Sequence, residues 1–324
     1  MNHLQKHFSA SLIALAAVLT AAPMAAWAAT VPSLGTAASF AVLGAGSAVP
    51  ATTNADATTA VSTTTSVITG DVGSAGAVSL TGTTVNGNVI LSGALVNVGS
   101  TYSGTSTPLP VQVINDFNTA YNNYAAIPCT GTLLPAYTGA ALTLAPGVYC
   151  SDGAVTFTNT TLTLDARGNA NAVWIFKIGT GGTGALTGTD FTVNMANSGD
   201  SCNVSWWVAE ASTMTRVSFQ GDILAGAGIT LTGLAGTPTP FNGDIMAKAG
   251  VTVTDVTILG CNASGGGNGG NGGHCGGGHH DGHDGDNDHK DYSRNPWSHD
   301  DHNGDNNHNG NKDHGEDHNQ RGKW

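Results

Sequence analysis

Residues 219–232 read Phe-Gln-Gly-Asp-Ile-Leu-Ala-Gly-Ala-Gly-Ile-Thr-Leu-Thr, and residues 241–254 read Phe-Asn-Gly-Asp-Ile-Met-Ala-Lys-Ala-Gly-Val-Thr-Val-Thr. Both segments show one order, a strand opened by Gly-Asp, a small-residue corner and a second strand, and the spacing is 22 residues. An earlier pair at 70–72 and 87–89 is spaced by 17 residues. Fixed periods of about 20 residues are typical of solenoids. The sequence therefore predicts a parallel β-helix whose coils stack in register.

The second strand of each coil alternates apolar residues with Thr or Ser. Successive side chains of a strand point to opposite faces, so the apolar residues are buried and the hydroxyls share the other face. Stacked strands would place these hydroxyls on a grid of about 4.8 by 6.7 Å. We expect residues 230–232 and 252–254 at its centre. The hydroxyl residues predicted for this face are Ser79, Thr81, Thr156, Thr158, Thr187, Thr213, Thr215, Thr230, Thr232, Thr252 and Thr254.

The predicted face carries no charged residue. Thr favours strands because it is β-branched, and Thr alternating with Val or Ile is also typical of an ordinary solvated face. A solvated face normally includes charges, which oppose edge-to-edge pairing of exposed sheets. Their absence from all the stretches that hold these eleven residues favours a partner that charges would repel or disorder. Arg216 and Asp255 follow two of the stretches and are expected to mark the end of the face.

The low charge excludes nucleic acid as a partner. Charged residues make up 10% of the chain, and the formal net charge is -12. Residues 29–261 hold four basic side chains, Arg167, Lys177, Arg216 and Lys248. Binding to phosphate backbones needs many Lys and Arg contacts. This part of the chain cannot supply them.

An enzyme is a weaker interpretation of the same pattern. Parallel β-helices include polysaccharide lyases, which need clustered carboxylates, often with Ca²⁺, and a basic proton acceptor. Asp71, Asp222 and Asp244 recur at one coil position, but Gly-Asp turns bind backbone amides with their side chains. Residues 29–261 contain no histidine. We therefore expect no catalysis and no cofactor, with adhesion to another extracellular surface or matrix as the alternative function.

Residues 1–28 are predicted to be a secretory signal peptide. Lys6 supplies a positive charge, residues 12–19 are apolar, and Ala26-Trp27-Ala28 fits a small-residue cleavage site. The apolar stretch is shorter than the roughly 20 residues that span a bilayer. We expect an exported protein, extracellular or periplasmic, that is not bound to a membrane.

Residues 108–135 interrupt the solenoid pattern between an N-terminal part (29–107) and a C-terminal part (136–261). Within 111–125, apolar side chains recur with helical spacing between flanking prolines. We predict one amphipathic helix over these residues, packed along the side of the solenoid. The continuously apolar strand at 172–178 is its expected partner.

Five cysteines in an exported chain suggest disulfides. The positions favour Cys129–Cys150 and Cys202–Cys261, although four cysteines allow three connectivities. Each bridge would stabilise the fold by roughly 3–4 kcal/mol in the chain-entropy model. Cys275 is left over and lies in the glycine-rich part of the tail.

Residues 262–324 form a tail of different composition, rich in Gly, His, Asp and Asn and without large aliphatic residues. Such a segment cannot form a core, so we expect it to be disordered. His-rich tracts bind transition metals weakly. The candidate ligands of an adventitious Ni²⁺, Cu²⁺ or Zn²⁺ ion are His279, His280, His283 and His289.

Six motifs, taken in order, resemble the microbial ice-binding protein family. They are Phe-Ala-Val-Leu-Gly at 40–44, Thr-Gly-Asp-Val-Gly at 69–73, Leu-Thr-Leu-Ala-Pro-Gly-Val-Tyr at 142–149, Leu-Thr-Leu-Asp-Ala-Arg-Gly-Asn at 162–169, Asn-Ala-Val-Trp-Ile-Phe-Lys-Ile-Gly at 171–179 and Cys-Asn-Val-Ser-Trp-Trp-Val at 202–208. The resemblance implies an irregular, roughly triangular right-handed β-helix with one long helix alongside. It also implies N-terminal coils that are not sequential with the rest. The flat Thr- and Ser-rich face would adsorb to ice as a monomer, without catalysis or cofactor.

Overall fold

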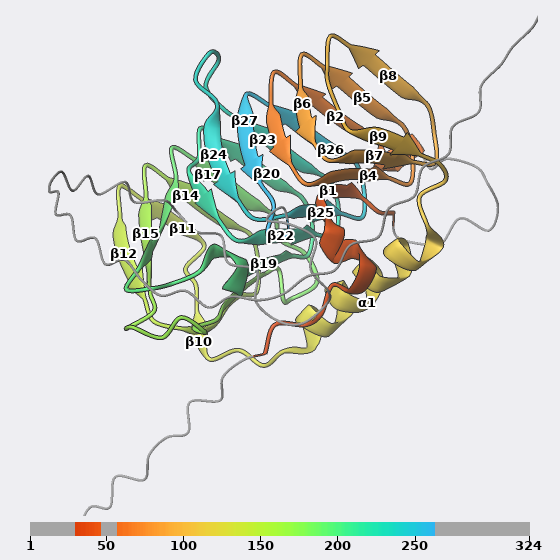
Figure 1. The fold of residues 1–324 in the computed structure, drawn as a ribbon. Helices are drawn as coiled ribbons and strands as arrows, with labels where there is room; N and C mark the ends of the chain where they lie inside the picture. Colours follow the sequence, from red (N-terminus) through yellow and green to blue (C-terminus); the bar gives the residue numbers. More distant parts are fainter. Residues whose placement is uncertain (1–29, 47–56, 263–324) are drawn as a thin grey trace, which may run out of the picture. The chain divides into compact units, whose positions relative to one another are not determined.

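The computed structural model describes residues 30–46 and 57–262, which belong to one compact unit. These residues form a β-solenoid in which every paired strand of the named sheets is parallel to its neighbours (Figure 1). The expected fold class, mainly β with one α-helix alongside, is confirmed. None of the helices in this part of the chain has the length and apolar character of a membrane span. The predicted signal peptide and the tail from residue 263, including Cys275, lie outside the described residues.

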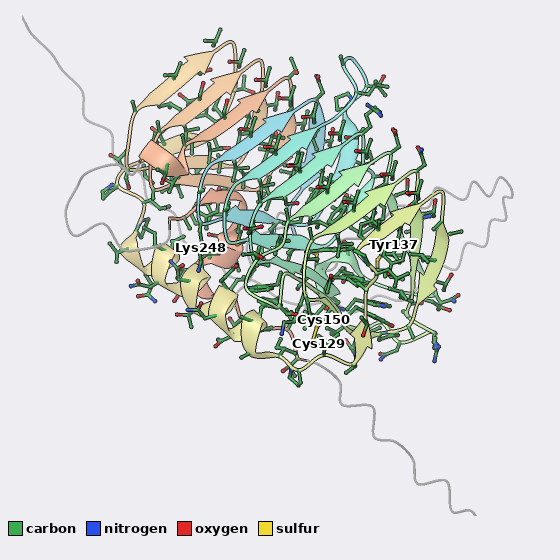
Figure 2. The ribbon with its side chains drawn as sticks, turned by 180° about the vertical axis from the view of Figure 1, so that it is seen from behind. Cys129, Tyr137, Cys150 and Lys248 are labelled. Atoms are coloured by element: carbon green, nitrogen blue, oxygen red, sulfur yellow. A yellow bond between two sulfur atoms is a disulfide. The ribbon has the colours of Figure 1, made fainter. Side chains whose placement is uncertain are left out.

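The solenoid has three sides. The first is a ten-stranded sheet with one face under the helix, here called the helix-covered sheet, whose strands in spatial order are β10 (Gly131–Thr132), β13 (Gly147–Ser151), β16 (Trp174–Ile178), β19 (Val204–Val208), β22 (Asp222–Ala225), β25 (Ile245–Ala247), β1 (Phe40–Gly44), β4 (Asp71–Ser74), β7 (Asn88–Leu91) and β9 (Gly104–Ser106). The second is a nine-stranded sheet, here called the threonine sheet, with the order β11 (Ala136–Thr138), β14 (Val155–Thr158), β17 (Leu186–Thr189), β20 (Ser212–Thr215), β23 (Ile229–Thr232), β26 (Val251–Thr254), β2 (Val61–Thr64), β5 (Val78–Thr81) and β8 (Leu95–Val98). Figure 2 shows the molecule from the opposite side, with the threonine sheet towards the viewer and Tyr137 labelled at the β11 end of that sheet.

The third side is split into two smaller sheets. One contains β12 (Ala141–Leu144), β15 (Thr161–Asp165) and β18 (Thr192–Ala196). The other contains β21 (Phe219–Gln220), β24 (Thr239–Asn242), β27 (Val256–Leu259), β3 (Val67–Thr69) and β6 (Thr84–Asn86). Three short 3-10 helices, η1 (Gly35–Ser39), η2 (Ala57–Thr59) and η3 (Ser201–Asn203), occur between strands.

The spatial order of the coils differs from their order in the chain. Strand β25 pairs with β1, which places Ile245 opposite Val42, and β26 pairs with β2 in the same way. The N-terminal coils therefore continue the stack beyond the last C-terminal coil, as the family resemblance implies. The C-terminal stack begins at β10, residues 131–132, and so before residue 136, where we expected it. The short β10 segment lacks the alternation that marks the other strands.

Aromatic side chains fill the solenoid interior. Trp206 is fully buried, with its ring stacked on Phe176 at 3.9 Å between centroids and tilted against Phe219 at 5.1 Å. Phe219 in turn stacks on Phe241 at 5.0 Å. Such pairs add to the apolar burial, which contributes about 25 cal/mol per Å². This core supports all three sides, because Trp206 also meets Phe157, on the inner face of the threonine sheet, edge-on at 6.3 Å.

Helix α1 (Val111–Ala126) confirms the helix expected at 111–125. Its buried stripe lies on the helix-covered sheet, where the Tyr124 hydroxyl is 2.8 Å from Ser205 Oγ and the Tyr121 ring is 5.2 Å from Trp207. The expected partner strand at 172–178 contributes through Ile175 in the same apolar cluster. Strand β19 supplies the polar and aromatic contacts with Tyr121 and Tyr124.

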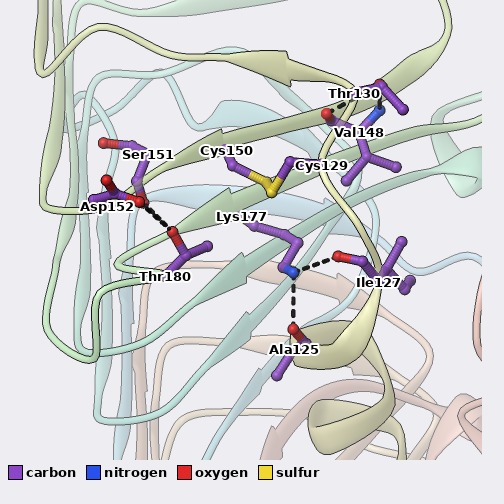
Figure 3. The surroundings of a disulfide bond; sticks show 10 residues. All are labelled: Ala125, Ile127, Cys129, Thr130, Val148, Cys150, Ser151, Asp152, Lys177 and Thr180. Atoms are coloured by element: carbon purple, nitrogen blue, oxygen red, sulfur yellow. Dashed lines mark hydrogen bonds between the residues drawn. A yellow bond between two sulfur atoms is a disulfide. The ribbon is translucent and has the colours of Figure 1, made fainter.

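A buried lysine caps the C-terminus of α1. Lys177 is 4% exposed, and its Nζ donates to the carbonyl oxygens of Ala125 at 2.8 Å and Ile127 at 2.6 Å (Figure 3). The last carbonyls of a helix have no partner within it, and they attract positive charge. Burial lowers the pKa of Lys177. This strand residue therefore orients the helix through its C-terminal end.

Lys177→Met is expected to lower the free energy of unfolding by about 2–3 kcal/mol, because two carbonyls at the helix C-terminus lose a charged donor. Urea denaturation followed by circular dichroism measures the change. The control is Lys248→Met, which removes a cation–π contact at 3.9 Å from the Tyr121 ring and should cost below about 1 kcal/mol. Equal losses in the two variants would contradict the capping role.

Both expected disulfides are present. Cys129 and Cys150 join the segment after α1 to β13, beside Lys177, with a sequence separation of 21 residues (Figure 3). Cys202 and Cys261 join η3 to the residues after β27 across 59 residues. In the chain-entropy model each closure stabilises the fold by roughly 3–4 kcal/mol.

Candidate functional site: the threonine sheet

The seven strands of the threonine sheet from β14 to β5 alternate buried and accessible residues. In β23, Ile229 and Leu231 are each 1% exposed, whereas Thr230 and Thr232 are exposed. The same alternation holds in β26 and β14, where the inward residues contact the aromatic and aliphatic core. The period of two therefore presents one side of every strand outward, as the sequence predicts.

The outward residues form two columns that run across the sheet. The first column contains Thr156, Thr187, Thr213, Thr230, Thr252, Ser62 and Ser79 in consecutive strands. The second contains Thr138, Thr158, Thr189, Thr215, Thr232, Thr254, Thr64 and Thr81. The register continues without a shift through all nine strands, so the fifteen hydroxyls form a regular grid. Neighbouring rungs are about 4.8 Å apart, and the columns about 6.7 Å apart.

All eleven residues predicted for this face lie in the two columns. Those of β14 and β17, which no Gly-Asp repeat precedes, occupy the same register as the others. The prediction omitted Ser62, Thr64, Thr138 and Thr189. Thr189 lies two residues after Thr187 in the same strand, so the period of two could have predicted that both residues lie on this face.

The prediction missed Ser62 and Thr64 in the strand at 61–64 because a threonine occupies an inward position of that strand. Thr63 is 1% exposed, and its hydroxyl donates to Thr83 Oγ1 at 3.1 Å. A buried hydroxyl is tolerated where it has a hydrogen-bond partner. Residues 62–64 therefore read as three hydroxyl residues in a row, without the apolar–hydroxyl alternation that an apolar residue at position 63 would give.

The hydroxyls of both columns are available to solvent. None of the fifteen forms a side-chain hydrogen bond with another described residue, and neither column contains a charged or aromatic side chain. Along the stack, apolar residues bound both columns at the β8 edge and the first column at the β11 edge. Val96 and Val98 of β8 continue the two columns and are 53% and 57% exposed, while Ala136 of β11 ends the first column at the other edge.

Charged residues lie at the side margin of the grid, one residue beyond the strands. Arg216 and Asp255 follow β20 and β26 and have positive φ values of 52° and 55°. Arg216 donates to both carboxylate oxygens of Asp190, at 2.7 and 2.6 Å, and these hydrogen bonds lower the pKa of Asp190. Asp255 accepts a hydrogen bond from Thr65 Oγ1 at 2.5 Å. The expectation that Arg216 and Asp255 mark the end of the face is confirmed.

The recurring aspartates bind backbone amides of the next coil. Asp71 accepts from the amide of Asn88 at 2.7 Å, Asp222 from that of Asp244 at 2.9 Å, and Asp244 from that of Cys261 at 3.1 Å. This is the turn role that we preferred for them over a catalytic cluster. They lie on or beside the helix-covered sheet and so away from the grid.

A family model described as Ice-binding-like matches residues 54–259 of the chain. Among curated proteins, an ice-binding protein of Nostoc sp. (strain HG1) is 37% identical over 129 residues. The match covers 40% of this chain and 46% of the Nostoc protein, so the chain spans less than half the length of that relative.

Solved structures of ice-binding proteins share the architecture. One from an Antarctic biological consortium superposes with a TM-score of 0.53 and 27% identity, covering 74% of this chain and 96% of that chain. Another, from the Antarctic ascomycete Antarctomyces psychrotrophicus, gives a TM-score of 0.51 and 25% identity over 70% of this chain and 97% of that chain.

Proposed function

Because this chain belongs to the ice-binding-like family, we propose that it adsorbs to ice through the threonine sheet and inhibits ice growth and recrystallisation. The observation that carries the proposal is the uninterrupted, uncharged grid of fifteen hydroxyls in register across β11 to β5. The choice of ice as the ligand rests on the relatives that are named as ice-binding proteins. The choice of the threonine sheet as the binding surface rests on the grid.

The physical basis is collective. A single hydrogen bond to water contributes only about 0.5–1.5 kcal/mol net. The grid holds many hydroxyls and methyls at fixed spacing on a rigid core, so ordering a water layer over them costs little conformational entropy. That layer can merge with the ice lattice. Charged side chains would bind water in other orientations, and here they lie at the margin, where Arg216 pairs with Asp190 and Asp255 binds Thr65.

The proposal includes further expectations from the sequence. The protein acts outside the cytoplasm as a monomer, without catalysis or cofactor, and does not bind nucleic acid. The tail histidines, His279, His280, His283 and His289, bind a transition metal weakly and independently of ice. These expectations rest on residues outside the described ranges or on composition, and they do not affect the site itself.

Adsorption to a single ice crystal tests the proposal. The full chain is labelled with a fluorophore at its amino groups, which leaves the grid unmodified because neither column contains a lysine. The labelled protein is then present while a single ice crystal grows slowly. We expect fluorescence on discrete crystal planes. Label that stays in the liquid, while the protein keeps its thermal transition, would refute ice binding. The same labelled chain is applied in parallel to a polysaccharide and a mineral surface. Retention on either of them would favour the adhesin alternative.

A further inference from the structure

Two buried carboxylates face each other in adjacent coils. Asp222 begins β22 and Asp244 directly precedes β25, and the two side chains are 5% and 1% exposed. One oxygen from each carboxylate and Cys261 Sγ all lie within 4.8 Å of one another. Cys261 forms the disulfide with Cys202, so it offers no thiolate.

No cation of the described protein neutralises this pair. None of its Lys or Arg side chains forms an ion pair with Asp222 or Asp244. Buried charges are found paired or bound to metals.

One oxygen of the pair lacks a partner. Each carboxylate uses its Oδ1 to accept a backbone amide, whereas Asp244 Oδ2 is buried and has no hydrogen bond within the described residues. Buried polar atoms without partners are rare in native proteins and point to a bound water or ion.

A cavity of about 250 Å³ adjoins the pair. Asp222 and Asp244 both line it, together with residues 31–34 of the N-terminal segment. Asn203 and Asn262 are also among its lining residues. The space is large enough for a cation together with several water ligands.

We propose that Asp222 and Asp244 bind a Ca²⁺ ion in this cavity. Ca²⁺ takes carboxylate, carbonyl and water oxygens in flexible geometry, whereas Mg²⁺ demands a regular octahedron and softer metals prefer the sulfur that the disulfide withholds. The ion would satisfy Asp244 Oδ2 and neutralise the pair. Strand β25 pairs with β1, so the ion stabilises the seam where the N-terminal coils join the C-terminal stack.

Calorimetry on the full chain tests the site. Thermal transitions are recorded near neutral pH in EDTA and in CaCl₂, for the wild type, Asp244→Asn and Asp71→Asn. Asp71 occupies the corresponding coil position and binds the Asn88 amide, but it is only partly buried, so it is the matched control. At a hundredfold excess over Kd we expect Ca²⁺ to raise the Tm of the wild type and of Asp71→Asn by about 5–10 °C. Asp244→Asn should show no rise.

Titration with CaCl₂ provides the second readout. We expect one binding heat that the wild type and Asp71→Asn share and that Asp244→Asn lacks. Any heat from metal binding to residues 263–324 is common to all three proteins, so it does not affect this comparison. An unchanged wild-type Tm in Ca²⁺ and EDTA would overturn the proposal, and this comparison needs no variant to fold. An equal rise in wild type and Asp244→Asn would also overturn it.

Discussion

Thr232→Tyr is expected to weaken adsorption to ice about 100-fold, the loss of about three hydroxyl contacts at about 1 kcal/mol each. Thr232 belongs to β23, the middle strand of the nine, with Thr215 and Thr254 beside it in the same column. A tyrosine ring projects beyond the plane of the threonine side chains, so the neighbouring hydroxyls can no longer share one flat water layer. Thermal hysteresis and recrystallisation inhibition, measured at matched concentrations, report the loss.

The matched control is Thr257→Tyr. Thr257 is exposed on β27, in a sheet of the third side, so the same substitution adds the same ring away from the grid. Hysteresis should be unchanged in this variant, and the Tm of both variants should stay near that of the wild type. If Thr232→Tyr keeps full hysteresis with an intact fold, or if Thr257→Tyr loses it equally, the threonine sheet is not the ice-binding face.

Trp206→Ala is expected to lower the free energy of unfolding by about 3–5 kcal/mol, the range for emptying a large aromatic site in a core. Trp206 is fully buried and lies between Phe176 and Phe219, with the edge of Phe157 against it. Its removal leaves a cavity under both the helix-covered sheet and the threonine sheet. Equilibrium urea unfolding measures the loss.

Trp206→Phe is the control for this site. A phenyl ring keeps the stack on Phe176, so less than half of the stability loss is expected. Both variants keep the grid residues, so the fraction that remains folded should retain its hysteresis. A loss below about 1 kcal/mol in Trp206→Ala would mean that the core closes over the missing ring.

Local sequence patterns predicted much of the site because their physical cause is local. Alternation with a period of two decides which side of a strand a residue faces, and it correctly predicts that Thr230 and Thr252 point outward. It failed at Thr63, where a buried hydrogen bond to Thr83 replaces apolar contact. It also failed at Thr189, where Gly188 occupies the inward position and supplies no apolar signal.

Long-range placement could not be predicted in the same way. Nothing at 61–64 or 251–254 indicates that these strands are neighbours, since parallel backbone hydrogen bonds carry no information about side-chain identity. The cavity that Asp222 and Asp244 line together with residues 31–34 likewise depends on segments distant in the chain. Both sequences look like ordinary Gly-Asp turns, and the missing partner of Asp244 Oδ2 emerges only from the packing.

The sequence by itself determined that this chain forms coils, a helix and an uncharged threonine face, because periodicity, proline positions and composition act over a few residues. Tertiary structure alone decided that the face is one continuous grid. Helix α1, with 16 residues, covers about 24 Å, or about five rungs, and runs along the helix-covered sheet, where it connects the N-terminal coils to the C-terminal coils in the chain. The coils at 61–81 extend the rungs that end at 251–254, and the length of the grid follows from this pairing.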